Sequence, residues 1–111
     1  MRISDRRQNV RFGWDVPVKL RKDGLDLSFE GRSVNVSQGG AFIRTENWPC
    51  FQVRDRATVV CFLPPGFTGQ DEPICLLGDA IVRRVDQVNE AVAVEFVKNL
   101  KQFEPVQQDA V

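Results

Sequence analysis

Two short stretches of the sequence carry residue types that could bind a small anionic ligand. The first contains three arginines, Arg6, Arg7 and Arg11. An arginine is always charged and can hold a phosphate with two parallel hydrogen bonds, and its flat guanidinium can also stack on a base. Arg7 and Arg11 are four residues apart, so they can face the same side in an extended or a one-turn conformation. A solvated basic tail is the other interpretation of this stretch.

The second stretch covers residues 35–40, reads Asn-Val-Ser-Gln-Gly-Gly, and marks where a strand ends and a tight turn begins. Strand side chains alternate between faces, which predicts Val34 and Val36 in the core. Asn35 and Ser37 then present an amide and a hydroxyl side by side on the outer face. The two glycines that follow allow a positive φ or the close approach of a ligand. Taken alone, the same residues also fit an ordinary hairpin connection.

Charge is distributed unevenly along a chain whose net charge is zero. Residues 1–24 hold seven lysines and arginines against three acidic residues, whereas residues 25–111 hold eight against twelve. General nucleic-acid binding needs a broad basic face, which a mildly acidic body does not offer. The distribution instead fits a basic arm that grips a small anion, or a solvated tail.

Length and composition indicate one globular domain. The 111 residues can bury a core without disulfides, and no apolar stretch is long enough to span a bilayer. The first residues lead into charge and not into the apolar run of a signal peptide, so a cytoplasmic location is expected. The three cysteines lack metal-ligand spacing and there is no histidine, so neither a metal nor a cofactor is expected. Cys61 and Cys75 fall in apolar runs and are expected to be reduced core residues.

Six segments have the apolar pattern of short strands, and turn residues separate them. They cover about residues 14–21, 25–36, 41–45, 56–63, 74–85 and 91–96. The apolar residues change from odd to even positions at Gly31, which predicts a β-bulge there. Leu100 and Phe103 permit one helical turn, which Pro105 ends. The sequence therefore predicts a small antiparallel β-barrel or sandwich over residues 14–104, between a flexible arm at 1–13 and a frayed tail at 105–111.

The two stretches, taken in order, resemble the PilZ domain family, receptors of the bacterial second messenger cyclic di-GMP. The family pattern is RxxxR followed further along by [D/N]xSxxG, and residues 7–11 and 35–40 match it. Residues 78–83 and 92–96 are similar to the last two barrel strands of the family. The resemblance implies an all-β fold, a six-stranded antiparallel barrel with a short C-terminal helix, and a non-catalytic receptor.

For the arm, the resemblance implies that Arg7 and Arg11 bind the phosphates and stack on or hydrogen-bond the guanines of the ligand. A basic residue before the motif, here Arg6, goes in this family with binding two stacked, intercalated ligand molecules instead of one. We expect ligand binding to order residues 1–13 on the barrel, because the phosphates supply the attraction that offsets the lost chain entropy. The altered surface would then meet an effector protein.

For the barrel, the resemblance implies that Asn35 and Ser37 contact a guanine, that Gly40 keeps the turn open and that Arg83 flanks the site. Two positions depart from the family pattern. Asn35 stands where aspartate is commoner, so the N–H groups of guanine lose a charged acceptor. Ala93 stands where glycine is frequent, which we expect to be a structural difference without effect on binding.

Two other function classes remain open from the sequence. A PilZ-like protein-interaction module that binds no nucleotide is the first, because some relatives act only through protein contacts. An enzyme is the second, with Asp79 and Glu95 as the carboxylate pair on adjacent predicted strands. Outward-facing solvated charges explain that pair more simply, and the chain lacks a nucleophile elbow and a phosphate-binding loop, so we expect no catalysis.

Overall fold

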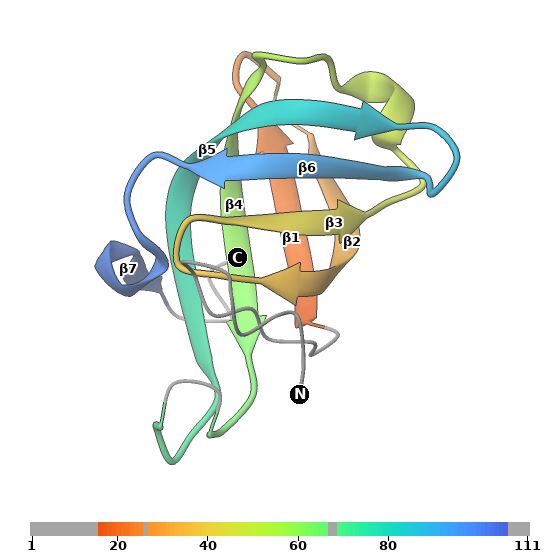
Figure 1. Cartoon of the computed structure of the whole chain (residues 1–111). Helices are drawn as coiled ribbons and strands as arrows, with labels where there is room; N and C mark the ends of the chain where they lie inside the picture. The colour runs from red at the N-terminus through yellow and green to blue at the C-terminus, as the bar shows by residue number, and fades with distance from the viewer. Residues whose placement is uncertain (1–15, 26, 67–68, 107–111) are drawn as a thin grey trace.

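The computed structural model describes residues 16–25, 27–66 and 69–106. Within them, seven antiparallel strands form one sheet in the order β4-β1-β2-β3-β6-β5-β7 (Figure 1). The strands are β1 (Val16–Lys22), β2 (Ser28–Val36), β3 (Gly40–Arg44), β4 (Arg56–Leu63), β5 (Ile74–Asp86), β6 (Ala91–Phe96) and β7 (Glu104–Val106). Because β4 also pairs with β5, the first six strands close into a barrel. The predicted all-β, six-stranded antiparallel barrel is therefore confirmed.

The end of the chain differs from the prediction. A single 3-10 turn, η3 (Leu100–Gln102), stands where a short C-terminal helix was expected, so that prediction is wrong. Glu104 precedes Pro105, and a residue before proline favours an extended backbone, which stops any helix. Pro105 and Val106, assigned to a frayed tail, instead pair with β5 as part of β7. In the described part of the chain, no helix has the length and apolar character needed to cross a membrane.

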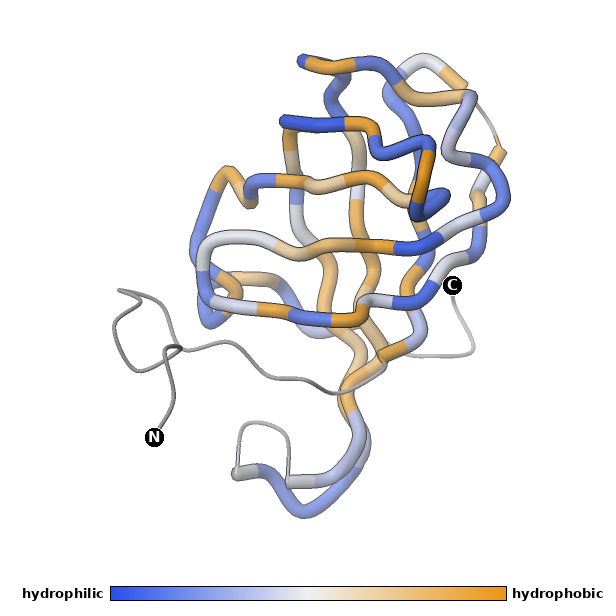
Figure 2. Tube along the Cα trace, turned by 45° about the vertical axis from the view of Figure 1, so that its right-hand side comes forward, coloured by the Kyte–Doolittle hydropathy of each residue, from blue (hydrophilic) through white to orange (hydrophobic). Residues whose placement is uncertain are grey.

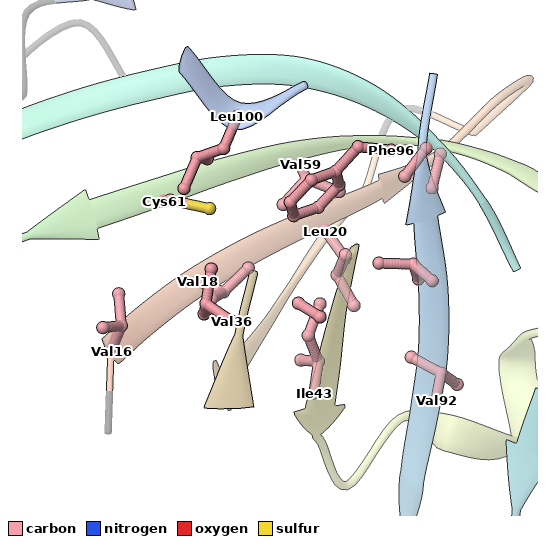
Figure 3. Packing of buried hydrophobic residues seen from close by; sticks show 14 of the residues in the cluster. Val16, Val18, Leu20, Val36, Ile43, Val59, Cys61, Val92, Phe96 and Leu100 are labelled. Atoms are coloured by element: carbon pink, nitrogen blue, oxygen red, sulfur yellow. The ribbon is translucent and has the colours of Figure 1, made fainter. Parts of the chain in front are cut away.

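The core fills the barrel interior with inward-facing side chains from all six strands, and Leu100 of η3 adds to it next to Cys61 (Figure 3). Val16, Val18 and Leu20 of β1 are buried, as their alternation predicts. Figure 2 shows the resulting change between apolar and polar residues along the strands. Burying each such side chain stabilises the fold by about 1.5–3 kcal/mol.

One end of the barrel is covered by the second 3-10 turn, η2 (Trp48–Cys50), and the residue that follows it (Figure 1). Phe51 is buried and its ring meets that of Phe29 edge-on, with the centroids 5.7 Å apart. Trp48 packs partly buried against the same core. These aromatic side chains therefore close this end of the barrel.

A β-bulge in β2 decides which of its side chains face the core. The register shifts between Ser33 and Asn35, so Val34 is the extra residue, and the bulge predicted at Gly31 is misplaced. Ser33 is consequently fully buried in place of Val34, and its hydroxyl donates to the Asn35 carbonyl oxygen at 3.0 Å. Gly31 serves another purpose, since a Cβ there would lie 2.7 Å from the carbonyl oxygen of Arg44.

A second β-bulge lies in the long strand β5. Val82 pairs with Val94 and Arg84 with Ala93, which leaves Arg83 as the extra residue. Val82 faces the core, while both arginines are exposed. The bulge therefore places two consecutive basic side chains on the outer surface, where a regular strand would expose only one of them.

Candidate functional site

Asn35, Ser37 and Gly40, three of the predicted site residues, line one open depression on the outer surface of the barrel. It has a volume of about 720 Å³ and lies over β2, β3, β6 and the second half of β5. Volumes of roughly 300–1,000 Å³ are usual for small-molecule sites. The depression is therefore large enough for a nucleotide-sized ligand.

One row of outward-facing residues forms the first half of its floor. The strand register pairs Asn35 with Phe42, Phe42 with Ala93, and Ala93 with Arg84. The guanidinium carbon of Arg84 lies 5.6 Å from the centre of the Phe42 ring, within range of a cation–π interaction. Ala93, which we expected to be structural, keeps the floor low between these larger side chains.

The turn that leaves β2 forms the other half of the floor. Ser37 is only 3% exposed, and its hydroxyl accepts the Gly39 N–H at 3.2 Å and donates to the Gly40 carbonyl oxygen at 3.4 Å. The backbone N–H of Ser37 donates to the same oxygen at 2.9 Å. Ser37 thus shapes the turn as well as lining the depression. Neither glycine has a positive φ, but a Cβ on Gly40 would overlap the carbonyl oxygen of Val94.

Charged groups occupy the rim of the depression on the β5–β6 side. The Nε of Arg83 lies 2.6 Å from Oε1 of Glu95, and both side chains are more than half exposed. Glu95 lines the depression, whereas Arg83 does not. Asp86 accepts hydrogen bonds from the side-chain amide and the backbone N–H of Asn89, which hold the pKa of its carboxyl below the usual value.

Arg84 and Glu95 line the depression but were not assigned to it from the sequence. Arg84 was missed because the bulge at Arg83, invisible in an apolar pattern, decides which arginine faces Phe42. Glu95 was considered only as a partner of Asp79, but the two carboxylates line different depressions. Within the described ranges, no group of histidine, cysteine or acidic side chains could hold a metal ion.

The arm residues Arg6, Arg7 and Arg11 lie outside the described residues. The place where the arm joins the barrel is nevertheless defined, because β1 begins with Val16 opposite Ser33. Ser33 is two residues from Asn35 on β2, and the strands are antiparallel. The start of β1 at Val16 therefore lies at the end of β2 that carries Asn35 and the depression.

The turn at residues 37–40 is tied to the C-terminal segment by three hydrogen bonds. The backbone N–H of Leu100 donates to the Gln38 carbonyl oxygen at 2.9 Å, and that of Lys101 donates to the Gln38 side-chain oxygen at 2.9 Å. The N–H of Phe96 donates to the Gly39 carbonyl oxygen at 2.8 Å. A displacement of this turn would consequently be felt at η3 and at the end of β6.

A second depression, of about 900 Å³, lies over β1, β2 and the connection after β3. Its lining includes Phe29, Phe62, Arg32 and Arg44. It is larger than the first, but none of the predicted site residues lines it. The smaller depression is therefore the stronger candidate for the functional site.

Comparisons with known proteins agree with this architecture. A family model described as the PilZ domain matches residues 5–104. The solved structure of the Bacillus subtilis inhibitor of motility, MotI/DgrA, is similar with a TM-score of 0.67 and 22% sequence identity. The alignment covers 85% of this chain and 44% of that one, and at this identity the likeness shows the fold alone. Among curated proteins, no sequence matches the chain.

Proposed function

Because the chain belongs to the PilZ domain family, we propose that it is a non-catalytic receptor of cyclic di-GMP. The observation that carries the proposal is that Asn35, Ser37 and Gly40, the polar and glycine positions of the second family motif, line one open depression. Arg84 and Phe42 share that depression.

The chemistry of the depression suits this ligand. Cyclic di-GMP carries two phosphates and two guanines, so its receptor needs cations and flat surfaces. Arg84 offers a guanidinium whose central carbon lies 5.6 Å from the centre of the Phe42 ring, and a guanine could stack on either group. Asn35 adds an amide at the edge of the floor, where it can hydrogen-bond a guanine. Arg83, paired with Glu95 on the rim, takes a flanking position.

The arm supplies the remaining positive charge in this proposal. Arg11 lies five positions before Val16, and five extended residues span at most about 18 Å, so in this proposal the arm turns back over the depression. Arg7 and Arg11 then bind the phosphates, and Arg6 favours two intercalated ligands per chain. Each charge-assisted hydrogen bond contributes about 1.5–3 kcal/mol, so a few of them offset the ordering of the arm and leave micromolar affinity.

Ligand binding alters a surface seen by an effector protein in two ways. The closed arm is new surface, and the turn at 37–40 passes any movement to η3 through Gln38. The solved neighbour MotI/DgrA is an inhibitor of motility, which supports a regulatory output for this chain as well.

Isothermal titration with cyclic di-GMP tests the proposal on the wild type and on Arg7→Ala, Asn35→Ala and Arg21→Ala. We expect two ligands per chain at micromolar affinity, about tenfold weaker binding in the first two variants, and no change in Arg21→Ala. Arg21 is the matched control because it is exposed on β1 and lines another depression.

Three results would count against the proposal, each against a different part. A wild type that binds no cyclic di-GMP leaves the ligand-free interaction module as the better account. Binding that is unchanged in both Arg7→Ala and Asn35→Ala refutes the site assignment. Amide exchange in residues 6–12 that stays the same at saturating ligand refutes the closure of the arm.

A further inference from the structure

Glu95 is the carboxylate of the depression whose oxygens are least engaged. Asp86 already accepts one hydrogen bond on each oxygen, at 3.1 and 2.8 Å, both from Asn89. Glu95 is paired with Arg83 through Oε1 alone, and no residue that the structure describes donates to its Oε2. Of the two carboxylates that line the depression, Glu95 is therefore the one available to a ligand.

The position of Glu95 gives it access to the same space as the motif residues. In the register of β3 and β6, Glu95 lies opposite Gly40, which has no side chain. Ser37 lies on the other side of Gly40, joined to it by backbone hydrogen bonding. Since neighbouring strands are about 4.8 Å apart, the backbones of Ser37 and Glu95 lie roughly 10 Å apart, with only the low Gly40 backbone between them. Asn35 lies on β2 two positions before Ser37, opposite Phe42, and lines the same depression.

We infer that Glu95 selects guanine, its carboxylate accepting the N1–H and N2–H donors of one base of the ligand. This inference rests on the proposed function. A carboxylate only accepts hydrogen bonds, and the pairing edge of guanine presents these two donors side by side. Adenine presents one donor and one lone pair at the same edge, so the carboxylate would face a repulsive contact. Asn35 is a neutral amide that can both donate and accept, and it does not discriminate in this way.

Arg83 is a positioning residue in this arrangement. The Arg83–Glu95 pair is exposed, and exposed ion pairs contribute little to stability. Its effect is to fix the direction of the carboxylate and to offset its charge beside an anionic ligand. Arg83 acts on the choice of base through Glu95 and makes no contact with the base itself.

Titration with two cyclic dinucleotides tests the inference. The wild type, Glu95→Gln and Glu104→Gln are each titrated with cyclic di-GMP and cyclic di-AMP, after circular dichroism confirms their fold. We expect the wild type to prefer cyclic di-GMP by about 100-fold and Glu95→Gln to lower that preference by about tenfold, because glutamine matches the donor and acceptor of adenine. Glu104→Gln is the matched control, since Glu104 is exposed on β7 and lines a different depression.

A third ligand isolates the contact with the exocyclic amine. Cyclic di-IMP keeps the N1–H of guanine and lacks its N2 amine, so the wild type should bind it about tenfold more weakly than cyclic di-GMP. Glu95→Gln should bind the two ligands with nearly equal affinity. For Arg83→Gln, we expect a difference in affinity between the two ligands that is smaller than in the wild type and larger than in Glu95→Gln. A Glu95→Gln protein that binds cyclic di-GMP with wild-type selectivity overturns the inference and leaves the proposed function standing. A wild type that binds no cyclic di-GMP overturns both.

Discussion

The side-chain oxygen of Gln38 lies 2.9 Å from the backbone nitrogen of Lys101, which is 63 residues later in the chain. The carbonyl oxygen of Gln38 also accepts the N–H of Leu100 at 2.9 Å. One residue of the motif turn therefore satisfies two of the backbone donors that open η3. This links the candidate site to the last strand of the sheet without any contact between β7 and the depression.

Replacing Gln38 by alanine should loosen the C-terminal segment. The substitution removes the hydrogen bond to Lys101 and keeps the one made by the Gln38 backbone, so we expect a loss of about 1 kcal/mol in the free energy of unfolding. Amide exchange should rise over residues 100–106 and stay unchanged in β1. Gln52→Ala, on the exposed connection before β4, is the control. Unchanged exchange at residues 100–106 would argue against the link.

The two arginines of the β5 bulge should differ in their effect on ligand affinity. Arg84 lies over Phe42 inside the depression, whereas Arg83 pairs with Glu95 on the rim. Arg84→Ala should weaken cyclic di-GMP binding by about tenfold, and Arg83→Ala by less than about threefold. Calorimetric titration of both variants measures the difference. Equal losses, or a larger loss for Arg83→Ala, would contradict the placement that the bulge gives them.

Gly78 should resist substitution because of Phe103. A Cβ at Gly78 would overlap the ring of Phe103, which also packs on Phe96 with the centroids 4.8 Å apart. We expect Gly78→Ala to lower the free energy of unfolding by about 1–3 kcal/mol, as overpacking does. In a Phe103→Leu background the same substitution should cost much less. Urea denaturation of the four proteins gives the coupling energy, and additive losses would refute the steric explanation.

The three thiols should differ in reactivity. Cys50 is exposed, while Cys61 and Cys75 are buried and free, as the sequence predicts. Burial raises the pKa of the Cys61 thiol to about 12 and also raises that of Cys75, so neither forms a thiolate near neutral pH. A thiol reagent at pH 8 should label one cysteine quickly and the other two only as the protein unfolds. Fast labelling of a second thiol would show that the barrel opens locally near β4 and β5.

The same buried thiols predict how stability changes with pH. A raised pKa means that the folded state keeps a proton that the unfolded state loses from about pH 9 upward. The stabilising contribution is complete below pH 9 and declines between pH 9 and the folded pKa, by up to about 1.4 kcal/mol per pH unit for each thiol. Urea denaturation at pH 8 and pH 10 measures this decline, and Cys61→Ala should reduce it. A Cys61→Ala protein with the wild-type decline would assign the effect to other groups.

Much of the barrel could be predicted because several strands have both an apolar pattern and turn residues or prolines at their ends. The run at 56–63 ends at two prolines, and the alternation at 91–96 follows a polar turn, so the predicted bounds of β4 and β6 match the structure. The alternation at residues 25–29 misled the prediction of β2, which begins only at Ser28. Leu25 and Leu27 lie exposed in the connection before it. An apolar pattern does not show whether a neighbouring strand is present to pair with the segment and bury its apolar side chains.

The residues of the candidate site that lie close together in the sequence could be predicted, whereas those that strand pairing brings together could not. Asn35, Ser37 and Gly40 belong to one turn, and the structure brings them to one depression. Arg84 and Glu95 come from strands whose outward faces depend on a register shift and on the neighbour across the sheet. Such contacts arise only when the barrel closes, so no spacing in the sequence records them.

The overlap between a Cβ at Gly40 and the Val94 carbonyl oxygen has a consequence for how motifs are used in surveys. At this point β3 and β6 lie so close together that only the hydrogen of a glycine fits between them, whether or not a nucleotide binds. A related domain that no longer binds the ligand would still need this glycine for its fold. Surveys that separate ligand-binding domains from non-binding ones should therefore rely on the polar positions, Asn35 and Ser37 here, and disregard the glycine.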